Sequence, residues 1–276
     1  MKFSVLRDDL VHPFMMGNKW RKLKYNLIDF KNSGKNTLVT FGGAFSNHLI
    51  ATAAAAKEYG FQSVGIVRGE DVKNPYIEFM QNAGMKLIFI SRENYRKKED
   101  GNYLKTLIYE MISKNILGSA DDAFFLPEGG ANESAVKGAK EIMDDIQDDS
   151  DYIVCACGTG ATLAGISRKL LPHQKAVGIA VLKAENYFEK QIQLLGGISE
   201  KTEIIYDYHF GGYAKTNKQL ELFCKKFSNE TGILIEPVYT GKVFFAIEDL
   251  IRKNYFKSGS KVTLVHTGGT FIFDHI

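Results

Sequence analysis

The sequence has few cysteines and few prolines. Its 276 residues include three cysteines, an odd number, and Cys155 and Cys157 stand one residue apart in an apolar run. This pattern argues against a disulfide framework and against a zinc site, so we expect buried free thiols. Five prolines in a chain that is 45% hydrophobic leave no low-complexity segment, which predicts a folded globular protein.

Long apolar runs and an excess of one charge are also missing. No apolar stretch approaches the roughly 20 residues that span a bilayer, and acidic residues stand in the first ten positions, where a signal peptide has an apolar core. The 35 basic and 32 acidic side chains are mixed along the chain. We therefore expect a cytoplasmic protein that binds neither membrane nor nucleic acid, while a small anionic ligand stays open.

What the sequence does contain is a regular alternation of two kinds of segment. From Thr37 onward, short apolar runs alternate with longer stretches of helical period, which predicts an α/β fold with a parallel sheet buried on both faces. Such sheets place ligand sites at the carboxyl ends of their strands. The expected strands are 37–41, 63–67, 86–90, 123–127, 152–156, 176–181, 202–206 and 261–266, and the expected helices are 47–59, 75–83, 103–114, 133–146, 162–171, 185–195, 216–227 and 242–254.

One acidic run is a candidate boundary within the chain. Residues 144–151, DDIQDDSD, separate the first four strand-helix pairs from the rest. The run is compatible with a crossing between two lobes and equally with the solvated end of a helix. A chain of this length fits one large domain or two small ones that share a cleft.

The strongest local motif is CGTGATLAG, residues 157–165, which follows one expected strand and precedes an expected helix. Glycines expose backbone N–H groups, and the start of a helix favours negative charge, so the loop suits a phosphate. The motif lacks the Gly-Lys-Ser/Thr of a P-loop and the spacing of a dinucleotide-binding loop. A plain turn between strand and helix is the alternative.

A second loop, FGGAFSNHL at residues 41–49, also joins a strand to a helix. Ser46 or Asn47 suits the N-cap of that helix, which is the structural interpretation and the favoured one for this loop alone. The functional interpretation is a polar cup, formed by Ser46, Asn47 and His48, for a carboxylate or a ring hydroxyl.

Three further segments carry reactive side chains. Lys19 and Lys22 stand three residues apart in an amphipathic stretch, residues 17–27, so they project from the same side of a helix. One lysine could bond to a carbonyl while the other neutralises a phosphate, although a basic helix face is usually only solvated. The segments EPVYTGK, 236–242, and LVHTGGT, 264–270, each bring a hydroxyl and a glycine to the place where a cleft is expected.

Together these segments resemble the pyridoxal-phosphate (PLP) enzymes of the tryptophan synthase β-subunit fold, in particular the family of D-cysteine desulfhydrase and 1-aminocyclopropane-1-carboxylate deaminase. The segments LRDDL, GNKWRKL, GGAFSN, LPEGGAN, CGTGATLAG, GGYAK, EPVYTGK and HTGG occur in the family's order from end to end. The resemblance implies two domains of three layers with open parallel sheets (PLP fold type II), and a homodimer. It predicts a large PLP-binding domain at 1–30 and 148–276 and a small domain at 31–147 that closes over the active site.

The resemblance also implies a role for each matching residue. Lys19 becomes the Schiff-base lysine that moves the α-proton, Tyr239 a second acid or base that faces the substrate, and Ser46 a contact of the substrate carboxylate that relays a proton. The remaining cofactor contacts implied are Lys22, Asn47, Thr159, Gly160, Ala161, Thr162, Thr240 and Thr267, and the remaining substrate contacts are Asn47, His48 and Tyr213.

Two positions bear on the reaction type. Deaminases of this family typically carry Glu where this chain has Thr240 and Leu where it has Thr267, whereas both threonines match the desulfhydrase pattern. A neutral hydroxyl in place of a carboxylate at the pyridine nitrogen makes the ring a weaker electron sink, and a weaker sink suffices for β-elimination. We therefore expect D-cysteine to give pyruvate, ammonia and sulfide. The alternatives are the cyclopropane deaminase, a related PLP enzyme, and a PLP- or amino-acid-binding protein without turnover.

Several features depart from the family or fall outside its motifs. Relatives usually carry a Pro-rich segment before the RDD motif and often glutamine where this sequence has Phe45, so an altered dimer contact or a narrower pocket is expected. His48, His209 and His266 are too scattered to predict a metal site. We expect His266 to bond to backbone at the end of a strand.

Overall fold

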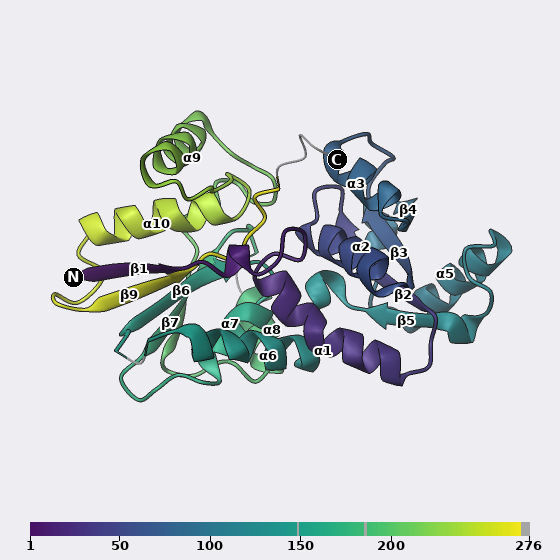
Figure 1. The fold of residues 1–276 in the computed structure, drawn as a ribbon, viewed down its shortest axis with the longest axis horizontal. Helices are drawn as coiled ribbons and strands as arrows, with labels where there is room; N and C mark the ends of the chain where they lie inside the picture. Colours follow the sequence, from purple (N-terminus) through teal and green to yellow (C-terminus); the bar gives the residue numbers. More distant parts are fainter. Residues whose placement is uncertain (148, 185–186, 272–276) are drawn as a thin grey trace. The chain divides into compact units, whose positions relative to one another are not determined.

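The computed structural model describes residues 1–147, 149–184 and 187–271, and over these residues it has the expected α/β architecture. The described chain divides into two compact units (Figure 1). Unit 1 consists of Met1–Lys22 and Ala131–Phe271, and unit 2 of Leu23–Gly130.

Unit 1 is built on a parallel sheet with the strand order β1-β9-β6-β7-β8. The strands are β1 (Lys2–Leu6), β6 (Tyr152–Cys157), β7 (Lys175–Ala180), β8 (Thr202–Ile205) and β9 (Lys261–Val265). Alternate side chains of β6 enter two separate cores, with Ile153 and Cys155 on one face and Tyr152 and Val154 on the other. A strand that is buried on both faces is therefore apolar throughout.

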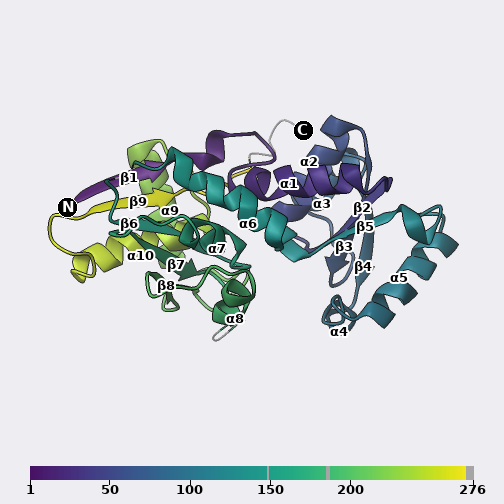
Figure 2. The same ribbon diagram turned by 90° about the horizontal axis from the view of Figure 1, so that it is seen from below.

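Helices cover both faces of this sheet. Figures 1 and 2 show α6 (Glu133–Lys140), α7 (Ala161–Ser167) and α8 (Tyr187–Leu194) on one face, and α9 (Lys218–Thr231) and α10 (Thr240–Arg252) on the other. On the α6 side, Gly165 lets two helices meet, because a Cβ atom there would come within 2.6 Å of Ala139 Cβ. This contact is one reason why residues 131–147 pack with unit 1.

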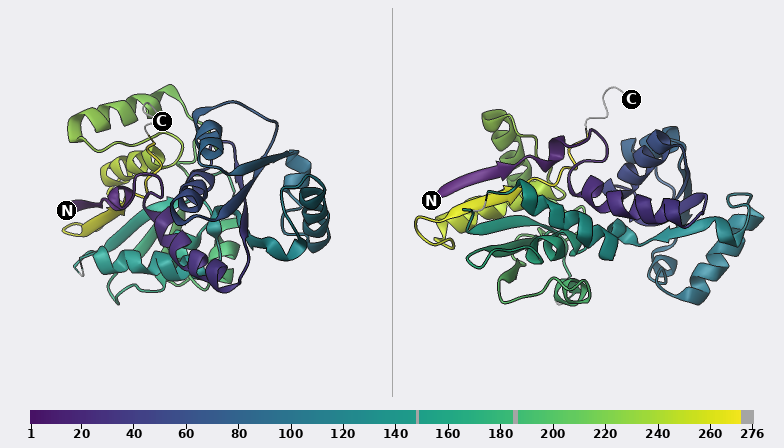
Figure 3. Two further views of the ribbon diagram at one scale, coloured as in Figure 1. Left: turned by 45° about the vertical axis from the view of Figure 1, so that its right-hand side comes forward. Right: turned by 60° about the horizontal axis from the view of Figure 1, so that its bottom comes forward.

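Unit 2 has its own parallel sheet with the strand order β4-β3-β2-β5. Its strands are β2 (Thr37–Gly43), β3 (Gln62–Arg68), β4 (Lys86–Ile90) and β5 (Ala123–Leu126), and its helices include α2 (Asn47–Tyr59), α3 (Pro75–Asn82), α4 (Arg92–Tyr95) and α5 (Gly101–Ser113). Neighbouring strands of this sheet all pair in parallel, and Figure 3 shows the unit from two further directions. Val39, Phe41, Ile66, Leu107 and Met111 lie in the core between this sheet and α5.

The expected strands are confirmed to within one or two residues, but β1 was not expected. It is an edge strand whose first three residues are exposed, so it lacks the apolar run that marks the buried strands. The expected helix 133–146 ends at Lys140 and continues as the 3-10 helix η4 (Glu141–Asp145). The expected helix 162–171 ends at Ser167, ahead of Pro172. Residues 185–186 of the expected helix 185–195 lie outside the described residues.

The unit boundaries lie earlier than the expected domain boundaries at 30 and 147. The first falls after Lys22, inside α1 (Asn18–Asn32), and the second falls after Gly130. The acidic run 144–151, apart from residue 148, lies within unit 1, where Asp144 pairs with Lys169 and Asp149 with Lys261. These ion pairs fit the interpretation as a solvated helix end.

The cysteines and the helices agree with two further expectations. Cys155, Cys157 and Cys224 are buried thiols without a disulfide in the described chain. In that same part of the chain, every helix is too short or too polar to span a membrane.

Candidate active site

The glycine loop of unit 1 follows β6 and ends at the first residue of α7. Gly160 has φ +82°, and a Cβ atom there would come 2.8 Å from Ile192 Cγ1, so only glycine fits. Because the first N–H groups of a helix have no partner within the helix, residues 159–162 present donors at the end of the strand. This arrangement suits an anion.

Lys22 lies beside this loop. Its side chain is buried, and its Nζ donates to Thr159 Oγ1 over 3.2 Å. Burial lowers the pKa of Lys22 to about 8. The neighbouring Cys155 stays a neutral thiol, because burial raises its pKa to about 12. Lys22 is therefore the positive charge at the loop when it is protonated.

Lys19 is joined to the same loop through Asn18. Its Nζ donates to Asn18 Oδ1 over 2.7 Å, and Asn18 Nδ2 donates to Thr162 Oγ1 over 3.0 Å. Burial, helped by the positive charge of Lys22 and opposed by Glu236, lowers the pKa of Lys19 to about 7. A large fraction of Lys19 is thus a neutral amine near pH 7, which is the nucleophilic form.

Two glycines place the start of α1 against the end of β9. Gly17 has φ +52°, and a Cβ atom there would come 2.7 Å from the carbonyl oxygen of Thr267. Gly268 has φ +78°, and its Cβ atom would lie 2.4 Å from Met16 Cβ. The two backbone segments therefore meet with no room for side chains, and Lys19 follows directly. Thr267 is buried in this contact.

Tyr213 and Tyr239 lie together near the glycine loop. Their rings are 6.2 Å apart, edge to face, and a Cβ atom on Gly158 would lie 4.0 Å from Tyr239 Cε1. The buried Lys242 anchors the segment that ends at Tyr213, because its Nζ donates to the carbonyl oxygens of Val181 (3.1 Å), His209 (2.9 Å) and Gly212 (2.8 Å). Lys242 was not among the residues expected from the sequence, although a lysine inside the apolar run GKVFFA is a signal that could have found it.

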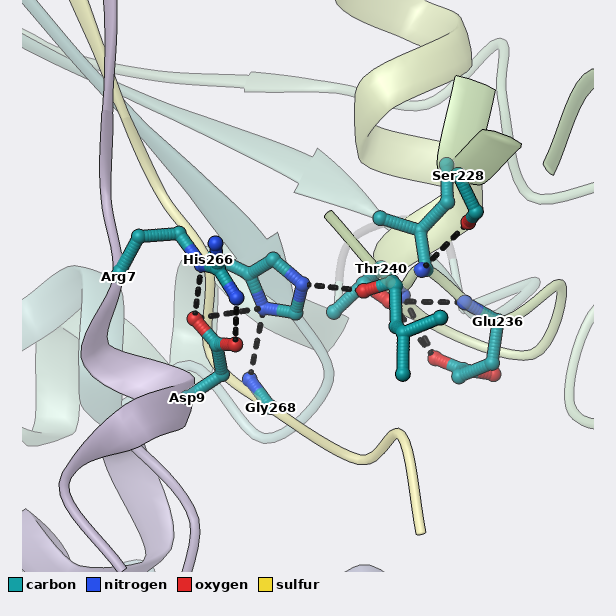
Figure 4. Close-up of polar contacts among 9 residues, drawn as sticks. Arg7, Asp9, Ser228, Glu236, Thr240, His266 and Gly268 are labelled. Atoms are coloured by element: carbon teal, nitrogen blue, oxygen red, sulfur yellow. Dashed lines mark hydrogen bonds and ion pairs between the residues drawn. The ribbon is translucent and has the colours of Figure 1, made fainter. Parts of the chain in front are cut away.

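Glu236 is a second residue that the sequence analysis missed. Its carboxylate accepts hydrogen bonds from the backbone N–H groups of Val238, Tyr239 and Thr240. It also accepts from the Thr240 hydroxyl (Figure 4). The residue keeps some exposed area, but its carboxylate lies deep among protein atoms, and burial raises its pKa to about 7 against the opposing hydrogen bonds. Its position at the head of EPVYTGK was the available signal.

His266 follows directly after β9 and is buried. Its Nδ1 accepts from Gly268 N–H over 3.2 Å, so its Nε2 carries the proton and donates to the Leu234 carbonyl over 2.7 Å (Figure 4). Burial lowers the pKa of His266, which keeps the ring neutral. The expected backbone bonding of His266 is confirmed. Asp9, paired with Arg7, lies 3.7 Å from Nδ1.

The polar loop of unit 2 joins β2 to α2. Ser46 is the N-cap of α2, where its Oγ accepts from Leu49 N–H over 3.3 Å, so the structural interpretation of this side chain is confirmed. Asn47 follows it, and its buried Oδ1 has no hydrogen-bond partner among the described residues. An unsatisfied buried amide is costly unless a ligand pairs with it. The role predicted for Ser46 with substrate stays a prediction.

His48 is turned toward the interior of unit 2. Thr40 Oγ1 donates its one hydrogen bond to the Leu126 carbonyl over 2.9 Å. His48 Nε2, 2.8 Å from Thr40 Oγ1, is therefore the donor in the bond between the two side chains. Its predicted contact with substrate stays a prediction. No three His, Cys, Asp or Glu side chains of residues 1–147, 149–184 and 187–271 are grouped as a metal ion requires.

In unit 1, the structure brings most of the predicted residues into one neighbourhood. Lys19, Lys22, Thr159, Thr162 and Tyr239 are linked through the contacts above, at the carboxyl ends of β6 and β9. A buried cation beside a glycine loop suits a phosphate, and a buried amine with a lowered pKa suits an aldehyde. These residues fit pyridoxal phosphate, which has both a phosphate and an aldehyde.

Comparisons with known proteins agree with this chemistry. The model of the pyridoxal-phosphate-dependent enzyme family matches residues 4–268. A putative 1-aminocyclopropane-1-carboxylate deaminase of Pyrococcus horikoshii is 33% identical over 96% of this chain and 83% of its own length. The mitochondrial bifunctional D-cysteine desulfhydrase/1-aminocyclopropane-1-carboxylate deaminase of Arabidopsis thaliana is 31% identical over 96% of this chain and 71% of its own length.

A solved structure confirms the expected fold type. The crystal structure of an "ACC deaminase homologue" superposes with a TM-score of 0.81 at 30% identity, covering 98% of this chain and 85% of that one. The fold is thus the one expected from the resemblance, with open parallel sheets and helices on their faces. The chain has the glycine loop and the paired lysines that suit pyridoxal phosphate, and the family model and the relatives above match it. It therefore belongs to the pyridoxal-phosphate-dependent enzymes, in the group that contains 1-aminocyclopropane-1-carboxylate deaminase and D-cysteine desulfhydrase.

Proposed function

We propose that the protein is a lyase that converts D-cysteine and one water into pyruvate, ammonia and sulfide. The observation that carries this proposal is the pair Thr240 and Thr267, two buried hydroxyl residues that match the desulfhydrase pattern where deaminases carry Glu and Leu. The C–H bond at the α-carbon and the C–S bond at the β-carbon break, sulfide leaves with the bonding electrons, and hydrolysis releases the nitrogen as ammonia.

Lys19 is the proposed base and the attachment point of the cofactor. Bound pyridoxal phosphate supplies the aldehyde that takes up an amino group and a ring that accepts electrons when the α-proton leaves. With a pKa of about 7, Lys19 can both accept and return a proton near neutral pH. Asn18 holds the Lys19 Nζ toward the glycine loop, so the amine is fixed before the cofactor binds.

Lys22 and residues 159–162 are the proposed phosphate site. The loop supplies N–H donors and the Thr159 hydroxyl, and Lys22 supplies the positive charge. Asn47 is the proposed partner of the ring hydroxyl, a role supported by its orphaned buried oxygen atom. Thr240 and Thr267 are the remaining proposed cofactor contacts.

Tyr239 is the proposed second acid or base, with Tyr213 beside it. The edge-to-face contact with Tyr213 and the contact with Gly158 hold the Tyr239 ring, so the position of its hydroxyl is restricted. A phenol near the substrate sulfur can donate the proton that sulfide needs when it leaves. Ser46 and His48 are proposed to contact the substrate.

A second candidate reaction is deamination of 1-aminocyclopropane-1-carboxylate. It is favoured by the 33% identity to a protein named for that reaction. The product separates the two reactions, because ring opening with loss of ammonia gives 2-ketobutyrate and β-elimination gives pyruvate.

The test uses purified protein loaded with PLP and given D-cysteine, L-cysteine or the cyclopropane amino acid in parallel. We expect pyruvate and sulfide in equal amounts from D-cysteine alone. Lys19→Ala should abolish turnover, whereas Lys31→Ala, at an exposed position on the same helix, should leave it unchanged. Cofactor bound without product from any of the three would overturn the proposed substrate and keep the family.

The homodimer and the cytoplasmic location also stay predictions. Light scattering of the purified protein should give twice the chain mass of 30.9 kDa. A single-chain mass would contradict the predicted dimer.

A further inference from the structure

The carboxylate of Glu236 is surrounded by donors. Its Oε1 accepts from Tyr239 N–H (2.9 Å), from Thr240 N–H (2.8 Å) and from the Thr240 hydroxyl (3.1 Å), and its Oε2 accepts from Val238 N–H (2.6 Å). Oε2 faces only N–H groups, whereas Oε1 also faces the Thr240 hydroxyl, which can donate or accept. The backbone N–H bonds favour the ionised carboxylate, to which Thr240 donates, whereas burial raises the pKa of Glu236 to about 7. The ionised state therefore prevails above pH 7.

The Thr240 hydroxyl is consequently restricted to one direction of hydrogen bonding. Its single proton goes to Glu236 Oε1, and one lone pair accepts the backbone N–H of Glu236 over 3.3 Å. What is left on Oγ1 is a second lone pair, which can accept but not donate. Thr240 is buried, so bulk water competes poorly for that lone pair.

A pyridine nitrogen has one position for a hydrogen bond and needs a different partner in each protonation state. The neutral nitrogen accepts and needs a donor, whereas the protonated nitrogen donates and needs an acceptor. A hydroxyl that is free to rotate serves either state, but one whose proton is committed to a carboxylate serves only the protonated state.

We propose that Glu236 is a positioning residue that accepts the hydrogen bond of the Thr240 hydroxyl, which leaves Thr240 as an acceptor only, so that the PLP ring is bound with its pyridine nitrogen protonated. The inference rests on the proposed function, in which Thr240 is the residue at that nitrogen. This inference replaces the expectation that a threonine at the pyridine nitrogen makes the ring a weak electron sink. The Glu236 carboxylate, four residues earlier, fixes the direction of the Thr240 hydroxyl and so favours the protonated ring. β-Elimination proceeds with either state of the ring. A protonated ring removes the argument from a weak electron sink, so the proposed substrate then rests on the match of Thr240 and Thr267 to the desulfhydrase pattern.

The test is a nuclear magnetic resonance measurement on the holoprotein loaded with PLP that is isotopically labelled at the ring nitrogen. Protonation moves the nitrogen resonance far upfield, and this signal requires no turnover. We expect a protonated nitrogen in the wild type and an unprotonated one in Glu236→Gln and Thr240→Val. Thr240→Ser, which keeps the hydroxyl, should restore the protonated signal.

Matched variants separate this role from simple capping of the turn at 236–240. Asp249→Asn removes a carboxylate that also accepts from a hydroxyl, that of Tyr208 at 2.8 Å, on the same helix as Thr240. It should leave the nitrogen signal unchanged. A Glu236 that only caps the turn would lose stability on substitution, but the ring would stay protonated.

Two results would overturn the inference. One is an unprotonated nitrogen in the wild type, and the other is a protonated nitrogen that survives in either Glu236→Gln or Thr240→Val. If Glu236→Gln fails to fold, Thr240→Val decides alone, because it leaves the N–H contacts of Glu236 in place. Failure of D-cysteine turnover with a protonated ring would refute the proposed substrate and leave this inference standing.

Discussion

Lys19 and Lys22 lie one helical turn apart on α1, yet their surroundings give them different chemistry. Lys22 meets the glycine loop directly through Thr159, whereas Lys19 meets it through Asn18. The positive charge of Lys22 lowers the pKa of Lys19 further, because two neighbouring buried ammonium groups repel each other. The lysine pair therefore supplies one cation for a phosphate and one amine for a carbonyl.

The lowered pKa of Lys19 makes a prediction about pH. Only the neutral amine attacks an aldehyde, so covalent capture of PLP by the apoprotein should rise with pH, with a midpoint near 7 rather than near 10.5. Lys22→Met removes the repelling charge, raises the Lys19 pKa and moves the midpoint to higher pH. The capture rate against pH, followed by absorbance, is the measurement. An unchanged midpoint in Lys22→Met would contradict the account.

Among the elements, the apolar strands could be predicted from the sequence and the edge strand could not. Buried strands such as β6 are continuous apolar runs, because both of their faces enter a core. β1 is partly exposed and, among the described strands, pairs with β9 alone, so its short mixed sequence resembles that of a loop. The motifs located Lys19 and Lys22, but only the fold reveals that Glu236 and Lys242 turn inward to bond with backbone.

The contact between the start of α1 and the end of β9 predicts a strong effect of one methyl group. Gly17→Ala adds a left-handed strain of about 1–2 kcal/mol and a clash with Thr267, for a total loss of about 2–4 kcal/mol in the free energy of unfolding. Gly34→Ala is the matched control, because Gly34 has φ +69° and open space around it. Its loss should be about 1–2 kcal/mol, from the strain alone.

Urea unfolding of the two variants makes this comparison. Gly17→Ala should also capture PLP more slowly than Gly34→Ala, because Lys19 follows the displaced segment by two residues. Equal stability losses in the two variants would show that the contact between Gly17 and Thr267 does not constrain the start of α1.

At the scale of the whole molecule, cofactor binding should stabilise the folded chain. A ligand that binds only the folded state adds about 2.7 kcal/mol when its free concentration is 100 times its Kd. We expect PLP to raise the urea midpoint by a corresponding amount. Lys22→Met should reduce this gain at the same PLP concentration, whereas Lys140→Met, at an exposed position in the same unit, should keep it. Equal gains in both variants would argue against Lys22 as the phosphate partner.

The central claim of the account is that Lys19 carries the cofactor. The most direct test is borohydride reduction of the PLP-loaded protein, which makes the cofactor-lysine bond permanent, followed by digestion and mass mapping of the labelled peptide. The account predicts the label on Lys19 and its loss in Lys19→Ala. A label on Lys22 or on the buried Lys242 of the wild type, or no label in a protein that retains PLP, would contradict it.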